Sequence, residues 1–263
     1  SPPKDGTYYL GVVLSQTSTT PFYSFGGYGF WQSTNIMTQY NAVSKDWTHI
    51  LVQGKIPNSI HKKSSAYLPD LDKFIVVGSK RINQTESAEI LDIDYGIFDY
   101  NFTEKQFKRL GEVYEPVLRT ILTGEKNNFT LAMGQYIIIS PYNNIPGYNH
   151  DLLYIIDTKN SYKGYLWTNP ARFQIRKFME DRGVLYGVYT RGNSIFLPQA
   201  QETFPYGTYQ VAEVSAKSLL AESKPLGPVM EKPMIENVRD FVLIIIGVIV
   251  FFIVARFFIL LKQ

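Results

Sequence analysis

A long apolar run near the C-terminus constrains this chain more than any other feature. Residues 241–255 read FVLIIIGVIVFFIVA, and after Arg256 the run resumes over residues 257–261. A helix of about 21 residues covers roughly 30 Å, the thickness of a bilayer core. Buried core helices seldom contain more than about 14 uninterrupted apolar residues. The sequence therefore predicts a single transmembrane helix over residues 241–261.

The charges beside this run predict its orientation. Arg256 and Lys262 lie at its C-terminal end without any acid, whereas both signs mix on its N-terminal side. Both long side chains can reach the membrane interface. The positive-inside rule then makes residues 262–263 a short cytosolic tail and places residues 1–240 in a lumen or outside the cell. The alternatives are a tail-anchored protein with a cytosolic domain and a virion membrane protein.

The N-terminal sequence and the sequons favour an exported domain. The chain opens with SPPK, without Met or an apolar signal segment, so we expect a removed signal peptide or a processed start. Asn-x-Thr triplets make Asn83, Asn101 and Asn128 candidates for N-glycosylation, so the protein is expected to be a glycoprotein. All three fall at expected loops or strand ends.

Composition excludes several kinds of site. The chain has no Cys, which rules out a disulfide scaffold, a thiol nucleophile and an iron–sulfur site. Its three His residues lack metal-binding spacing, and no phosphate loop or GxSxG motif is present. A net charge of +3 is too small to indicate nucleic-acid binding. We therefore expect no catalytic residue, no metal and no cofactor.

Residues 1–214 are predicted to form a β-rich domain. Short apolar runs rich in Val, Ile, Tyr and Phe alternate with turn residues, and helical periodicity is hard to find. Residues 215–240 contain several prolines, so a short helical turn over 215–222 followed by a juxtamembrane linker is expected. The chain is thus predicted to be all-β with one C-terminal helix.

An internal repeat divides the β-rich domain into four units, at about 7–50, 51–110, 111–168 and 169–214. The spacing Tyr40-x6-Trp47 recurs as Tyr100-x6-Phe107, and a proline follows each of the first three units. The prolines are Pro57, Pro116 and Pro170.

These units resemble Kelch repeats, whose blade has a strand ending in Gly-Gly, then Tyr-x6-Trp, then a Pro-x-x-Arg/His turn. The resemblance implies a β-propeller, or a partial propeller, of about four blades; a β-sandwich is the alternative. Four units are the lower limit for a closed ring. The matching residues are Gly26, Gly27, Tyr40 and Trp47; Pro57, His61, Gly78, Tyr100 and Phe107; Pro116, Arg119 and Trp167; and Pro170 and Arg172.

Two polar pairs deserve a test as active sites. Asp92 and Asp94 lie on one face of a predicted strand and are compatible with a glycosidase pair, although an acidic solvent face explains them as well. His150 and Asp151 follow a polar loop whose residue types are compatible with binding calcium or a sugar. An exposed turn is the simpler interpretation of these residues.

Taken together, these features predict a non-enzymatic single-pass membrane protein whose β domain binds or scaffolds another protein, as an accessory subunit of a membrane complex. The lipid bilayer and other protein subunits are its expected partners, with a glycan as an alternative ligand. Two further functions stay open: a structural membrane protein of a large virion, and a membrane-tethered carbohydrate-active protein.

Overall fold

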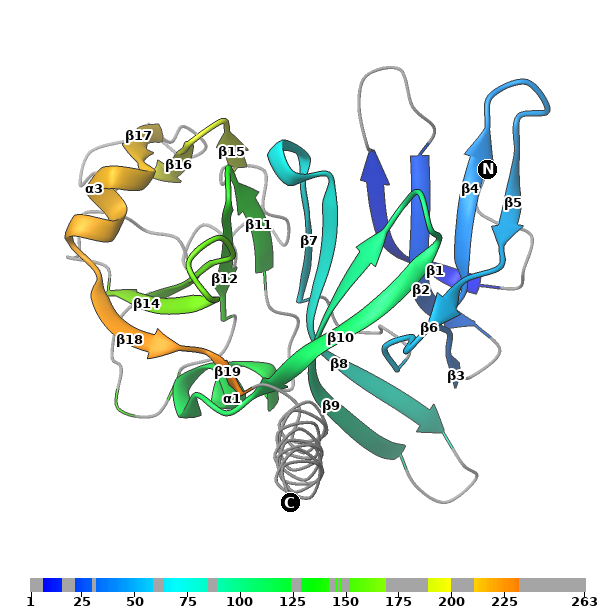
Figure 1. The fold of residues 1–263 in the computed structure, drawn as a ribbon, viewed down its shortest axis with the longest axis horizontal. Coiled ribbons are helices and arrows are strands. Elements are labelled where there is room, and N and C mark those ends of the chain that lie inside the picture. Colours follow the sequence, from blue (N-terminus) through cyan, green and yellow to red (C-terminus); the bar gives the residue numbers. More distant parts are fainter. Residues whose placement is uncertain are drawn as a thin grey trace, which may run out of the picture.

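The computed structural model describes residues 7–15, 22–29, 32–58, 64–84, 89–123, 129–141, 145, 147, 152–168, 189–199 and 211–231. This part of the chain is mostly β-strand, and two short α-helices and one 3₁₀ turn accompany the strands (Figure 1). The all-β class expected from the aromatic and β-branched runs is therefore confirmed.

The strands form four consecutive antiparallel meanders, which we call units 1 to 4. Unit 1 consists of β1 (Thr7–Ser15), β2 (Phe22–Gly29), β4 (Met37–Asn41) and β5 (Asp46–Ile50). Unit 2 consists of β7 (Ser65–Leu68), β8 (Lys73–Gln84), β9 (Glu89–Asn101) and β10 (Gln106–Val113). The short β3 (Gln32–Ser33) pairs with both β2 and β8, so hydrogen bonding joins these two units into one sheet.

The second half of the domain repeats this arrangement. Unit 3 consists of β11 (Phe129–Met133), β12 (Tyr136–Ser140), β13 (Leu152–Asp157) and β14 (Lys163–Thr168). The described strands of unit 4 are β15 (Tyr189–Arg191), β16 (Ser194–Pro198) and β17 (Val211–Ser215). These meanders follow the four units predicted from the repeat.

Three hydrophobic cores lie between successive units. Alternation along the strands produces them, because neighbouring residues of a strand point to opposite faces. In β8, Phe74 and Val76 pack into the core shared with unit 1, while Ile75 and Val77 pack into the core shared with unit 3. In β12 and β13 the same alternation separates the core toward unit 2 from the core toward unit 4.

The units are arranged like the blades of a propeller. The first strands of successive units lie next to one another in the order β1, β7, β11, β15. Figure 1 places unit 1 at one end of the longest axis of the molecule and unit 4 toward the other. The fold is thus a propeller-like stack in which the two inner units have apolar side chains on both faces.

A short helix interrupts the β pattern after unit 2. Helix α1 (Pro116–Thr123) begins at Pro116, where the missing N–H of proline costs nothing. The Glu115 carboxylate accepts bonds from the N–H groups of Val117 (3.1 Å) and Leu118 (2.8 Å). The Kelch resemblance implies a Pro-x-x-Arg turn at Pro116, but Pro116 begins a helix. At two turns, this helix is too short for its periodicity to stand out in the sequence.

The segment expected to be a linker is partly built into the domain. Ser215 caps helix α3 (Ala216–Ala221), β18 (Lys224–Pro228) pairs with β14, and β19 (Met230–Glu231) pairs with β10. Between β18 and β19, Val229 is fully buried. Residues 215–231 are therefore packed against units 2 to 4 and do not form a free stalk.

The predicted membrane anchor lies beyond the described chain. In the ranges given above, no helix combines the length and apolar character needed to cross a bilayer. Residues 232–240, the predicted span 241–261 with Arg256, and the predicted tail with Lys262 are outside those ranges.

Candidate interaction surface

Three hairpins share one turn, and it is the most regular feature of the repeat. In unit 1, the Asn41 Oδ1 accepts bonds from the N–H groups of Val43 (2.9 Å) and Ser44 (3.3 Å). In unit 2, the Asn101 Oδ1 accepts bonds from Thr103 (2.9 Å) and Glu104 (3.1 Å). In unit 3, Asp157 does the same with Lys159 and Asn160, at 3.2 and 3.3 Å.

This turn explains the spacing of the aromatic repeat. Tyr40 lies opposite Trp47, and Tyr100 lies opposite Phe107, on the strands that the turns join. Lys45 and Lys105 close the two turns with φ values of 53° and 52°. The internal repeat predicted from the sequence uses only the aromatic pair. It leaves out the Asn that follows each Tyr, although YN occurs in both segments.

Unit 3 departs from the predicted alignment. Its turn is one residue longer, and Ile156 opposite Gly164 takes the place of the aromatic pair. Trp167 lies opposite Leu153, further along the strand, and is fully buried in the core shared with unit 4. Its Nε1–H donates to Glu222 at 3.1 Å. Trp167 is a core residue, but not the register equivalent of Trp47 and Phe107.

The two aromatic pairs differ in burial. Tyr100 and Phe107 are each 1% exposed, because they face unit 1 across the first core. Tyr40 and Trp47 are half-buried, with ring centroids 5.5 Å apart. In the described part of the chain, no further unit precedes unit 1.

The repeat glycines lie in the second strand of their unit, β2 or β8. Gly26 and Gly78 have φ values of +75° and +69°, in the region that favours glycine. A Cβ on Gly78 would lie 2.8 Å from Cδ1 of Leu122 in helix α1. Gly27 follows in β2.

The remaining predicted residues are scattered. Pro57 is buried just after β6 (Gln53–Gly54), which pairs with β10. Asn83 lies in β8 and Asn101 ends β9. Asn128, His61, His150, Asp151, Pro170 and Arg172 lie outside the described residues.

Hairpin turns of units 1 and 2 gather at one end of the domain. We call this end the hairpin rim and define it by Phe22, Val43, Tyr67, Asp72 and Phe102. Val43 is 94% exposed and Phe22 is 51% exposed. Figure 1 shows the β4–β5 and β7–β8 turns on the side of the molecule opposite β19. The described chain thus ends far from this rim.

Aromatic rings from both units support the rim. The ring centroid of Phe102 lies 5.1 Å from that of Tyr23, 5.7 Å from Tyr67 and 5.0 Å from Tyr100. The Tyr67 hydroxyl donates to Asp72 at 2.8 Å. Burial, and then this hydrogen bond and the Asp72 charge, raise the pKa of Tyr67. Burial raises the pKa of Tyr100 to about 12. These tyrosines are neutral at ordinary pH.

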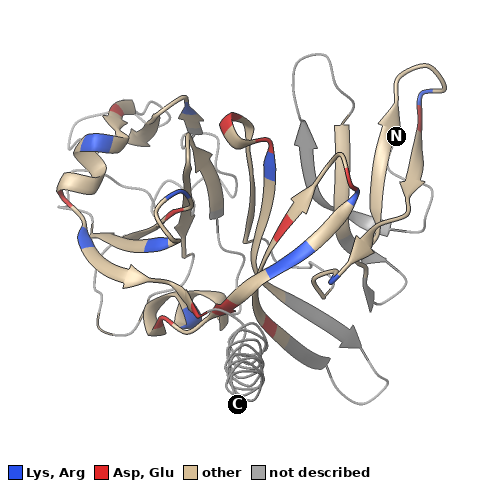
Figure 2. Cartoon of the chain, viewed as in Figure 1, with Lys and Arg blue, Asp and Glu red and all other residues tan. Residues whose placement is uncertain are grey.

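Charged residues do not collect by sign in the described part of the domain. Figure 2 shows Lys and Arg interspersed with Asp and Glu along the strands and turns. The turns of the hairpin rim also carry both signs: Lys45 in unit 1, and Asp70, Asp72, Glu104 and Lys105 in unit 2. The described part of the domain therefore has no region of one charge sign that would steer a highly charged partner toward it.

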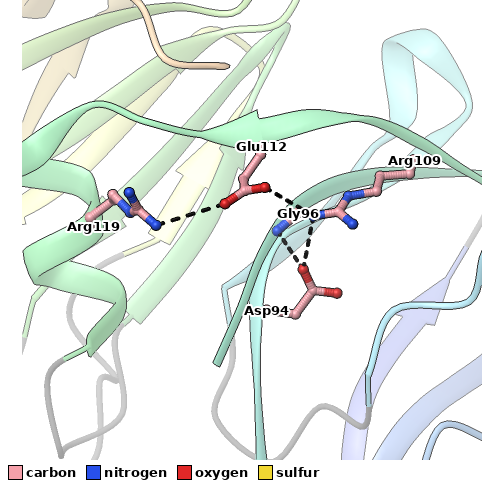
Figure 3. Close-up of polar contacts among 5 residues, drawn as sticks. All are labelled: Asp94, Gly96, Arg109, Glu112 and Arg119. Carbon is pink, nitrogen blue, oxygen red and sulfur yellow. Dashed lines mark hydrogen bonds and ion pairs between the residues drawn. The ribbon is translucent and has the colours of Figure 1, made fainter. Parts of the chain in front are cut away.

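Of the predicted acidic pair, the structure describes the side-chain contacts of Asp94. Asp94 accepts bonds from the Gly96 N–H (2.8 Å) and from Arg109 (3.3 Å), as Figure 3 shows. Arg109 also contacts Glu112 at 3.5 Å, and Glu112 contacts Arg119 at 3.7 Å. The Asp94 carboxylate is thus held in a network that ties β9 and β10 to helix α1. The side chain of Asp92 lies outside the description.

Arg119, expected in a blade turn, lies in helix α1. Its guanidinium stacks over Tyr95, 4.1 Å from the ring centroid. Partly exposed ion pairs of this kind contribute little stability individually. The network of Arg119, Glu112, Arg109 and Asp94 therefore serves mainly to connect β9, β10 and helix α1.

Within the described residues, no three His, Asp or Glu side chains are grouped so that they could hold a metal ion. No family model matches the chain, and no curated protein matches it either.

Proposed function

We propose that the protein is a non-enzymatic single-pass membrane protein whose β domain, in a lumen or outside the cell, binds another protein as an accessory subunit of a membrane complex. The observation that carries this proposal is the exposure of two apolar residues on the hairpin rim, where Val43 and Phe22 expose 94% and 51% of their surfaces.

The composition of the rim supports a protein contact. Exposed apolar and aromatic side chains surrounded by polar residues are typical of protein–protein interfaces. Burying one such aliphatic side chain against a partner contributes about 1.5–3 kcal/mol. Each of the two exposed apolar residues of the hairpin rim, Val43 and Phe22, therefore offers an anchor for a partner.

The position of the rim fits the predicted anchor. The described chain ends at Glu231, on the opposite side of the domain from the hairpin turns (Figure 1). With residues 241–261 in the bilayer, the rim points away from the membrane and is open to the ectodomain of a neighbouring subunit. The propeller-like stack of the four units also agrees with the propeller that the Kelch resemblance implies.

Site-specific crosslinking tests the proposal. A photoreactive amino acid at position 43 of the full-length chain, in native membranes, should give one dominant crosslinked partner. The same group at position 211, which is 41% exposed in unit 4, serves as the control. Val43→Glu should abolish the crosslink formed from a probe at position 22. Equal crosslinking from positions 43 and 211, or an undiminished Val43→Glu product, would overturn the proposal.

A further inference from the structure

We infer that Asn101 is N-glycosylated and that its turn displays the acceptor amide. The inference rests on the proposed function, because it requires residues 1–240 to face a lumen or the exterior. It deepens that proposal by assigning a modification to the rim itself.

The geometry of the turn supports this choice. Asn101 is exposed at the end of β9, and its Oδ1 holds the N–H groups of Thr103 and Glu104. These bonds fix the carboxamide through its oxygen, so Nδ2 is the atom left for a new bond. Thr103, the hydroxyl residue that the triplet requires, is also exposed.

The modification is a substitution at Nδ2 that needs a polyprenyl-pyrophosphate-linked oligosaccharide as donor. A bond forms between Nδ2 and C1 of the first sugar, the bond from C1 to the pyrophosphate oxygen breaks, and Nδ2 loses one proton. No electron transfer is involved. The product is a bulky, hydrophilic group at the surface.

Of the other two candidates, the structure describes only the backbone of Asn83. The backbone of Asn83 lies between two strands, opposite Ile90 of β9 and Gln32 of β3. Asn128 lies outside the described residues. Only the Asn101 triplet is therefore seen in a hairpin turn.

Unit 1 supplies a matched control. Asn41 is held in the same turn by the same pair of backbone bonds, but Val43 stands where Thr103 stands in unit 2. Val43 is 94% exposed, so Val43→Thr completes an Asn-x-Thr triplet with little effect on packing. This variant reports whether the compartment glycosylates a turn of this shape.

A glycan at Asn101 would also divide the rim. Phe102, the next residue, contacts Tyr23, Tyr67 and Tyr100 in the part of the rim built from unit 2. The sugar would shield that part and leave Phe22 and Val43 of unit 1 for the protein partner.

The test is electrophoresis of the full-length chain, expressed in a eukaryotic secretory pathway, before and after peptide-N-glycosidase treatment. Asn101→Gln and Thr103→Ala should each remove one glycan-sized step, and Thr103→Ala does so while keeping the Asn101 side chain. Asn83→Gln should change nothing. Val43→Thr should add one step.

The outcomes separate the inference from the proposed function. If Val43→Thr adds a step but neither Asn101→Gln nor Thr103→Ala removes one, the assignment of Asn101 is overturned and the lumenal or external placement stands. If neither the natural chain nor Val43→Thr carries a glycan, the placement itself is overturned, and the inference with it.

Discussion

Phe107 and Trp47 occupy the same register position in successive units, but only Phe107 is enclosed by a neighbouring unit. Because Phe107 is 1% exposed among Phe25, Phe74 and Tyr100, Phe107→Ala should lower the free energy of unfolding by about 3–5 kcal/mol. From its half-buried position, Trp47→Ala should cost less, about 1–2 kcal/mol. Urea unfolding of both variants measures the difference. Equal losses would mean that an equally tight cover encloses Trp47.

Gly78 combines a left-handed backbone with a crowded surrounding, so two penalties add at this residue. Its φ is +69°, and a Cβ would lie 2.8 Å from the Leu122 side chain. We expect Gly78→Ala to lower the unfolding free energy by about 2–4 kcal/mol. Gly192 is a matched control, because its φ is +56° but nothing lies within 4 Å. Gly192→Ala should cost about 1 kcal/mol, and a similar loss at both positions would contradict the role given to Leu122.

At the scale of elements, the strands after helix α3 are the part of the fold that differs most from expectation. The Val229 N–H donates to the Tyr162 carbonyl at 2.9 Å, and its own carbonyl accepts from Tyr114 at 3.2 Å. One residue thereby joins units 2 and 3 at the end of the described chain.

Val229→Ala should therefore destabilise the whole domain by about 2 kcal/mol, since it removes buried methyl groups from a fully enclosed site. Val211→Ala, at a position 41% exposed, should change stability by less than about 0.5 kcal/mol. Chemical unfolding compares them. A negligible effect at Val229 would mean that residues 224–231 do not belong to the cooperative unit.

At the scale of the whole molecule, buried tyrosines predict a loss of stability in alkali. Burial raises the pKa of Tyr100 from 10.0 to about 12, so above pH 10 the unfolded chain gives up this proton first. The stabilisation is complete below pH 10 and is lost as the pH rises through 12. Two pKa units correspond to about 3 kcal/mol.

Unfolding in urea at pH 8 and pH 11.5 tests this dependence, with absorbance at 295 nm following tyrosinate. Tyr100→Phe should show a shallower fall in stability over the same interval, because the titrating hydroxyl is gone. An identical pH dependence in both proteins would show that Tyr100 ionises freely in the folded state.

Sequence alone determined the β class, the four repeats and the register of two hairpins. These features are local: alternation sets the faces of a strand, and Tyr-x6-aromatic spacing fits one turn of four residues closed by Lys45 or Lys105. The Asn41 and Asn101 turns are equally local, so the Asn that follows each Tyr was enough to predict them.

Only the tertiary structure decided which faces are covered. Phe107 and Trp47 follow the same spacing in the sequence. Unit 1 covers Phe107, whereas Trp47 is half-buried. Helix α1 forms because Glu115 satisfies its first N–H groups and the core shared by units 2 and 3 encloses its apolar side. Strands β18 and β19 pair with strands more than 50 residues earlier. Burial and strand pairing across such separations depend on how all the units pack, so local sequence patterns do not predict them.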